Sequence, residues 1–142
     1  MTLVQFCEKG DLEGVKAALK RGDDVNTKDI YGETGLMRAV RLKHNSVVAL
    51  LLNTPNWKSE DGWSALHSAV NWENIDGLKL LLSHPSITAL IINQKDNYHG
   101  RTPVMLAMKC KKVNILRELV NHPSVDLDTR DGSGSSLEES AR

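Results

Sequence analysis

The residues that most often bind metals or act as nucleophiles are cysteine and histidine, and this chain of 142 residues has two and five of them. Cys7 and Cys110 lie far apart, and the sequence contains no C-x-x-C pair and no Cys/His ligand spacing. We therefore expect no metal, no other cofactor and no disulfide framework. Free thiols fit a reducing compartment best, which predicts a cytoplasmic or, alternatively, a nuclear protein.

Hydroxyl and acidic residues offer no catalytic arrangement either. Ser133 and Ser135 lack the G-x-S-x-G frame of a serine nucleophile, and no G-K-[ST] phosphate loop is present. The adjacent carboxylates Asp23 and Asp24 are expected to face solvent separately. We predict that the protein is not an enzyme, that His99 is available to a partner, and that the other histidines have structural or solvated positions, namely His44, His67, His84 and His122.

All three tryptophans lie in one short stretch, "NWKSEDGWSALHSAVNW", as Trp57, Trp63 and Trp72. One explanation is that the rings fill a gap in the core. We favour a surface role, because tryptophan is enriched in the hot spots of protein interfaces. The core positions of the stretch and the helix after it are already supplied by Ala65, Leu66, Ala69, Val70, Leu78 and Leu81. The cluster therefore predicts a docking site for a protein partner.

The overall charge excludes partners that are recognised through a strong field. Eighteen basic residues balance eighteen acidic ones, so nucleic acid is not expected as a partner, and neither is an anionic membrane surface. No stretch approaches the roughly 18 apolar residues of a membrane span. With 40% hydrophobic and 25% charged residues, the composition is typical of a soluble globular protein.

A repeating pattern identifies the elements that carry these residues. Three stretches, "LLLNTPN", "LLLSHPS" and "ELVNHPS", each read as the apolar end of a helix followed by proline. Proline disfavours the α conformation in the residue before it. The helices are therefore predicted to stop near Asn53, Ser83 and Asn121.

A second pattern precedes each of these stops, in "GETGLMRAV", "GWSALHSAV" and "GRTPVMLAM", with an echo in "GSSLEESA". Two places after each glycine stands a hydroxyl residue that can cap a helix, so helices are predicted to begin after Thr34, Ser64, Thr102 and Ser136. Each unit then consists of a turn, a short inner helix, a tight connection, an outer helix and a loop. Small residues at equivalent places predict close helix packing: Ala39, Ala69 and Ala107.

These motifs resemble the ankyrin-repeat family, whose unit of about 33 residues carries a G-x-T-P-L-H-x-A core. "KRGDDVNTKDIYGETGL" is close to the family's connection, although the core proline is kept only at Pro103 and its histidine only at His67. The glycine spacings of 30, 38 and 34 indicate that the loop 55–61 has lost residues and that the loop 85–99 has gained them. The resemblance implies an all-α solenoid of stacked helix-turn-helix units with a concave groove.

On this basis residues 1–142 are expected to form a single domain, monomeric when free. It divides into an N-terminal capping helix pair without its turn (1–28), three repeats (29–58, 59–93 and 94–128) and a partial C-terminal repeat (129–142). In the family's geometry, residues beside the turn glycine and at the end of the inner helix line the groove. The predicted partner-binding residues are Tyr31, Glu33, Arg41, Leu42, Trp57, Trp63, Asn71, Trp72, Tyr98, His99, Arg101 and Lys109.

The predicted function is therefore a non-catalytic protein–protein interaction module with an aromatic hot spot on its concave face. Two alternatives stay open. Trp63 with Arg101 or Lys109 could stack and neutralise a nucleotide or oligonucleotide, as in ankyrin domains that sense such ligands. An engineered binder built on the same scaffold would also confine its aromatic residues to groove positions, and it too would bind a protein partner.

Overall fold

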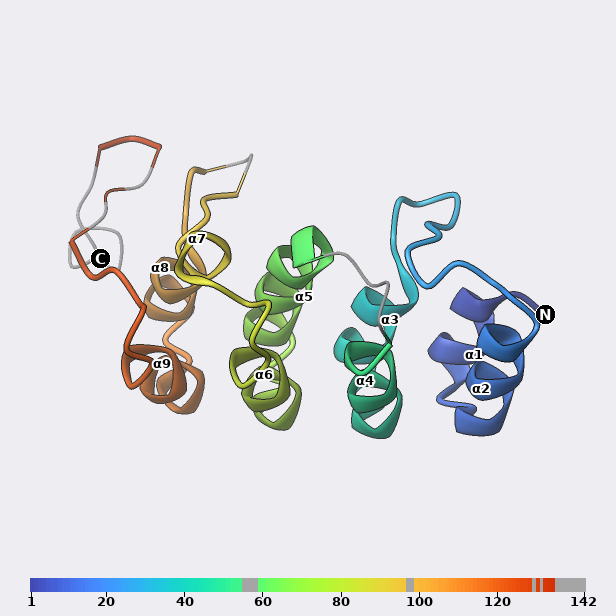
Figure 1. The fold of residues 1–142 in the computed structure, drawn as a ribbon. Coiled ribbons are helices and arrows are strands. Elements are labelled where there is room, and N and C mark those ends of the chain that lie inside the picture. Colours follow the sequence, from blue (N-terminus) through green and yellow to red (C-terminus); the bar gives the residue numbers. More distant parts are fainter. Residues whose placement is uncertain (55–58, 97–98, 129, 131, 135–142) are drawn as a thin grey trace.

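A computed structural model describes residues 1–54, 59–96, 99–128, 130 and 132–134, and for residues 59–64 it describes the backbone alone. The described residues form four helix pairs that stack in a row (Figure 1). The pairs are α1 (Leu3–Lys9) with α2 (Leu12–Lys20), α3 (Gly35–Arg41) with α4 (Asn45–Leu52), α5 (Ser59–Asn71) with α6 (Ile75–Leu82), and α8 (Pro103–Lys109) with α9 (Val113–Val120). The described residues contain no strand, only one isolated antiparallel bridge between Lys28 and Thr34. The predicted all-α solenoid is confirmed.

The helices form an inner and an outer row. In the inner row α1 contacts α3, α3 contacts α5, and α5 contacts α8. In the outer row α2 contacts α4, α4 contacts α6, and α6 contacts α9. Long loops project from the inner row on one side, before α3 and before α8 (Figure 1). Within the described residues no helix has both the length and the apolar character needed to cross a bilayer.

Most of the predicted helix ends are confirmed. The backbone N–H of Met37 donates to the Thr34 hydroxyl at 3.3 Å, and that of Met105 donates to the Thr102 hydroxyl at 3.4 Å, so both threonines cap inner helices. The outer helices end at the three residues predicted from the prolines, Asn53, Ser83 and Asn121. The helix predicted after Ser136 lies outside the described residues.

The predicted start of the third inner helix is wrong. Helix α5 begins at Ser59, so Gly62 and Ser64 lie within the helix and not in a turn and a cap. The connection before this helix is the shortened one, which leaves few residues for a projecting loop. Serine followed by Glu60 and Asp61 also favours a helix start there, because acidic residues in the first turn interact well with the helix dipole.

The lengthened loop 85–99 contains a short helix that the sequence pattern did not predict, α7 (Ala89–Ile92). Ile87, Ile91 and Ile92 from this loop are buried in the core, whereas Leu90 is 80% exposed. The Asn93 side chain fixes the loop to the following one: its Nδ2 donates to Ser124 O at 2.8 Å, and its Oδ1 accepts from Asp126 N at 2.7 Å. The inserted residues are therefore part of the packed structure.

The core is one continuous apolar cluster between the two helix rows. Ala39, Ala69 and Ala107 are fully buried, which confirms that the inner helices approach closely at small residues. The core positions predicted around α5 and α6 are all buried: Ala65, Leu66, Ala69, Val70, Leu78 and Leu81.

Three histidines tie neighbouring repeats together, as expected of structural residues. His44 Nε2 lies 3.0 Å from Glu8 O, His84 Nε2 lies 2.9 Å from Leu52 O, and His67 Nε2 lies 3.3 Å from Arg101 O. A carbonyl oxygen only accepts hydrogen bonds, so each ring donates through Nε2. Each bond joins groups more than 30 residues apart in sequence and fixes one repeat against the next.

The tight connection between the inner and outer helix places Gly10 in the left-handed region in the first pair and a charged residue in the other three: Lys43, Glu73 and Lys111, with φ of 63°, 53° and 57°. Side chains other than glycine are disfavoured there. We expect Lys111→Gly to raise the free energy of unfolding by about 0.5–1 kcal/mol, measured by urea denaturation. As a control, Lys16→Gly inside α2 should lower it by about 1 kcal/mol. Destabilisation by both variants would contradict the argument.

Candidate functional site

The structure separates the described partner-binding candidates into two groups, at the two ends of the inner helices. One group lies in or beside the projecting loops: Tyr31, Glu33, His99 and Arg101. The other lies where the inner helices end: Arg41, Leu42, Asn71, Trp72 and Lys109. The Arg41 side chain reaches back to the first group, with its Nη2 3.5 Å from Glu33 Oε2. At 1.5 Å per residue, the seven residues of α3 put about 10 Å between the two groups.

The group at the helix ends forms a row across the repeats. Leu42, Trp72 and Cys110 each directly follow the last residue of an inner helix, and all three are exposed. Trp72 is 49% exposed and Leu42 is 40% exposed. Packed helices lie about 8–10 Å apart, so these side chains follow one another at that spacing. We call Leu42, Trp72 and Cys110 the helix-end row.

Three of the predicted residues lie outside what the structure describes. Trp57 and Tyr98 are not among the described residues, and Trp63 is described only as part of the α5 backbone. The predicted grouping of all three tryptophans therefore stays a prediction.

Two members of the loop group, Tyr31 and Glu33, contact a residue that was not predicted, Arg38 on α3. Its guanidinium Nη1 lies 3.1 Å from Glu8 Oε1, its Nε lies 2.9 Å from Glu33 Oε2, and its Nη2 donates to Asp29 Oδ2. The Tyr31 ring lies over the same guanidinium, with its centroid 5.8 Å from Arg38 Cζ. Arg38 thus connects α1, α3 and the projecting loop 22–34.

Asp29 shapes the loop that carries Tyr31. Its Oδ1 accepts from Tyr31 N at 2.8 Å and from Glu33 N at 3.0 Å, and its backbone N–H donates to Glu33 O at 2.9 Å. Partial desolvation opposes ionisation of the Asp29 carboxyl. The hydrogen bonds from Glu33, Arg38 and Tyr31 outweigh it and lower the pKa of Asp29 below its ordinary value.

We expect Asp29→Asn to lower the melting temperature at neutral pH, by an amount that shrinks in acid. Because the Asp29 pKa is lower in the folded state, its stabilisation is fully present above the ordinary value of about 3.9 and is lost as pH falls through the folded-state pKa. Thermal unfolding of both proteins between about pH 7 and pH 3 checks this. A difference that does not change with pH would contradict it.

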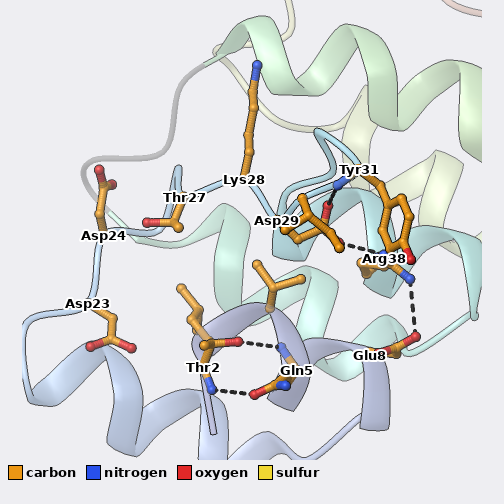
Figure 2. A pocket seen from close by; sticks show the side chains of 13 residues that line it. Thr2, Gln5, Glu8, Asp23, Asp24, Thr27, Lys28, Asp29, Tyr31 and Arg38 are labelled. Atoms are coloured by element: carbon orange, nitrogen blue, oxygen red, sulfur yellow. Dashed lines mark hydrogen bonds and ion pairs between the residues drawn. The ribbon is translucent and has the colours of Figure 1, made fainter.

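A pocket of about 660 Å³ opens beside this network, between the loop 22–34 and the N-terminal end of α1. Leu3, Val4 and Ile30 supply apolar surface to it. Figure 2 shows Asp23 and Asp24 on one side of the pocket and Glu8 with Arg38 on the other. Ile30, at 92% exposure, and Tyr31, at 75%, are the most open apolar side chains beside it.

Only part of this arrangement could be inferred from sequence. The aspartate of the D-x-x-G connection, Asp29, is a known type of turn former, and that was a usable signal. The contact between Arg38 and Glu8 spans 30 residues and joins two different helix pairs, so no local pattern indicates it.

The described residues show no arrangement for covalent or metal chemistry. Burial raises the pKa of the Cys7 thiol to about 12, which leaves it protonated at neutral pH. No group of three or more His, Cys, Asp or Glu in the described part of the chain is placed to hold a metal ion. What the geometry offers is an exposed aromatic and apolar surface with charged neighbours.

Comparison with known proteins agrees with this architecture. A family model described as ankyrin repeats in three copies matches residues 3–90, and a single-repeat model matches residues 99–132. The chain is 33% identical over 114 residues to a putative ankyrin repeat protein of fowlpox virus, and 38% identical over 88 residues to an ankyrin repeat protein of vaccinia virus. These matches cover 76% and 54% of this chain but only 33% and 37% of the two viral proteins. The chain thus spans about a third of the length of these relatives.

Proposed function

The chain belongs to the ankyrin-repeat family, and from this premise we propose that it docks a protein partner on the helix-end row, with Trp72 as the central anchor. Ankyrin repeats are protein–protein interaction modules and are typically non-catalytic. The observation that carries the proposal is the exposure of Trp72, which is 49% exposed. It has the largest side chain of the helix-end row and leaves about half of that side chain in water.

The neighbours of Trp72 support an anchor role. Leu42 extends the apolar surface along the helix-end row, and the polar residues Asn71 and Lys109 stand at the ends of α5 and α8. An apolar centre inside a polar rim is how interfaces of ordinary size gain affinity. Because the helices are already fixed by stacking, docking would order few groups and lose little free energy in doing so.

The groups at the two ends of the inner helices can belong to one interface. A partner that covers about 800 Å² easily spans the roughly 10 Å between Trp72 and the loop group. We therefore include Tyr31, Glu33, His99 and Arg101 in the proposed interface, and Trp57, Trp63 and Tyr98 as sequence-based members of it.

We expect Trp72→Ala to weaken partner binding by about 1–4 kcal/mol and to leave the melting temperature nearly unchanged. Affinity capture from a lysate, with quantitative mass spectrometry of wild type beside the variant, identifies the partner, and titration calorimetry then measures the affinity. Val120→Ala, which removes an exposed apolar side chain from the outer row, is the matched control and should bind normally.

Equal capture by wild type and Trp72→Ala would exclude the helix-end row as the interface. A large drop in melting temperature would instead show that the ring has a packing role. Salt distinguishes the nucleotide alternative, because a complex with a polyanion weakens steeply with added salt whereas apolar docking tolerates it. The hypothesis of an engineered origin stays a prediction.

A further inference from the structure

The helix-end row is surrounded by more cations than carboxylates. In the three repeats that carry the row, we consider the last residue of each inner helix, the tight connection and the first turn of each outer helix. These segments contain five cations and two carboxylates: Arg41, Lys43, Lys109, Lys111 and Lys112, with Glu73 and Asp76. The chain as a whole has no net charge, so this end of the helices has a local excess of positive charge.

Ion pairs use only part of this excess. Arg41 is compensated by Glu33 from the loop group, and Lys112 Nζ lies 2.8 Å from Glu73 Oε1. The three cations outside these two pairs are opposed by one carboxylate: Lys43, Lys109 and Lys111 are all exposed, and Asp76 lies in the first turn of α6. The end that carries Trp72 therefore stays positive after its ion pairs are counted.

Two of these lysines flank Trp72. Lys43 directly follows Leu42 in the repeat before Trp72, and Lys111 directly follows Cys110 in the repeat after it. Neither lysine makes an ion pair within the described part of the chain. Because packed helices lie about 8–10 Å apart, each lysine follows the row at roughly one Debye length from the Trp72 connection.

The charge of Lys43 already acts on the connection beside Trp72. The hydrogen bond and the charge of Lys112 lower the pKa of Glu73, and the charge of Lys43 acts in the same direction. Glu73 thus lies in the field of two cations. A single carboxylate does not neutralise both, so a partner group above this connection also experiences a positive field.

A hollow between the third and fourth connections offers a place for a partner side chain. It has a volume of about 170 Å³ and begins at Glu73, the residue after Trp72. Ile75 and Val113 give it apolar surface, and Lys111 is one of its cations. Val113 is 64% exposed. A side chain with an apolar stem and a carboxylate end matches this lining.

The same surroundings suit a protein segment better than a nucleic acid. A nucleic acid carries a charge on every phosphate and gains affinity by having several of them neutralised. Such a regular row of charges cannot avoid Glu73 and Asp76. A segment with a few carboxylates can place them opposite Lys43 and Lys111 and keep its apolar residues over Trp72.

We propose that the partner segment that docks on the helix-end row is acidic. An apolar side chain of the segment covers Trp72, and aspartate or glutamate side chains on both sides of it lie opposite Lys43 and Lys111. This inference rests on the proposed function and names the chemistry of the partner. Complementary charge at the rim of an interface acts mainly on the rate of encounter and on the rejection of wrong partners.

Fluorescence anisotropy with three short labelled peptides tests the charge preference. All three contain the same leucines, separated by glutamate in the first, glutamine in the second and lysine in the third. We expect the glutamate peptide to bind at least about tenfold more tightly than the lysine peptide, with the glutamine peptide between them. Added salt should narrow the difference, because it screens exposed charges. Equal binding of the three, tighter binding of the lysine peptide, or binding of none would overturn the proposal.

A labelled single-stranded oligonucleotide of similar length tests the other class of anion. We expect it to bind more weakly than the glutamate peptide. Tighter binding of the oligonucleotide would assign this end of the helices to nucleic acid and would also overturn the proposal.

Charge reversal locates the peptide on the molecule. Lys43→Glu combined with Lys111→Glu should weaken the glutamate peptide at least about tenfold and strengthen the lysine peptide. The connections accept glutamate, since Glu73 occupies the equivalent place with φ of 53°. Lys20→Glu combined with Lys95→Glu makes the same change in net charge at exposed lysines elsewhere and should have little effect. Equal loss in both double variants would mean that net charge alone decides binding, which contradicts a local site.

The Trp72→Ala protein separates this inference from the proposed function. It should bind all three peptides more weakly by a similar factor and keep the preference for glutamate, because the ring carries no charge. If Trp72→Ala weakens binding but the wild type binds the three peptides equally, only the acidic partner is excluded. If the preference for glutamate depends on the two lysines but Trp72→Ala binds as wild type does, Trp72 is excluded as the anchor and the charge preference remains.

Discussion

Replacing Asn74 with alanine should lower the free energy of unfolding by about 1.5–5 kcal/mol, the largest effect that we expect from a single polar side chain in this protein. Asn74 is 2% exposed and begins α6. Its Oδ1 accepts from Gly77 N at 2.9 Å, and its Nδ2 donates to Val40 O at 2.9 Å and to Asn45 Oδ1 at 2.8 Å. One amide thus caps a helix and joins two repeats.

Two costs make up this value. Loss of the helix cap costs about 0.5–2 kcal/mol. Loss of the amide donor removes the hydrogen bonds to Val40 O and Asn45 Oδ1, at about 0.5–1.5 kcal/mol each, while Val40 O keeps its bond from Lys43 N at 3.2 Å. Urea denaturation followed by circular dichroism measures the sum.

The equivalent residue of the next repeat provides the control for Asn74. Lys112 occupies the same position before α9, makes no cap hydrogen bond and pairs with Glu73 at the surface at 2.8 Å. Lys112→Ala should therefore cost less than about 1 kcal/mol. If both alanine variants cost the same, the cross-repeat bonds of Asn74 contribute nothing beyond their surface counterparts.

Helix ends and core positions could be predicted because they depend on neighbours in sequence. Proline at Pro55, Pro85 and Pro123 restricts the residue before it, and Thr34 and Thr102 need only amides three residues away to cap their helices. The helix start predicted from the same kind of local pattern at Ser64 is wrong. There the glycine-to-hydroxyl pattern is intact, but the shortened connection lets the helix begin at Ser59, six residues before the predicted Ala65.

The contacts of Asn74 and Arg38 could not be predicted, because they join residues that are far apart in sequence. Asn74 reaches Val40 across 34 residues, and Arg38 reaches Glu8 across 30. In sequence both residues look like ordinary polar positions at or on a helix. Only the stacking of one repeat on another brings these residues to their partners, and a single repeat gives no sign of its neighbour.

Gly77→Ala should reveal how tightly this connection is packed. A Cβ atom at Gly77 would lie 2.4 Å from Asn74 Nδ2 and 3.1 Å from Asn45 Oδ1. The added methyl group must displace the amide from its cross-repeat bonds, so we expect a loss of about 1–3 kcal/mol in the wild-type protein. This is notable because alanine within a helix is ordinarily better than glycine by about 0.5–1 kcal/mol.

The sign should reverse once Asn74 is absent. With Asn74→Ala in place there is no amide to displace, so adding Gly77→Ala should raise the free energy of unfolding by about 0.5–1 kcal/mol. The double-mutant cycle should then give a coupling of about 1.5–4 kcal/mol. Additive effects would mean that the glycine serves the backbone of α6 and not the amide. A reversal would show that a residue without a side chain is required here because the neighbouring repeat uses the space.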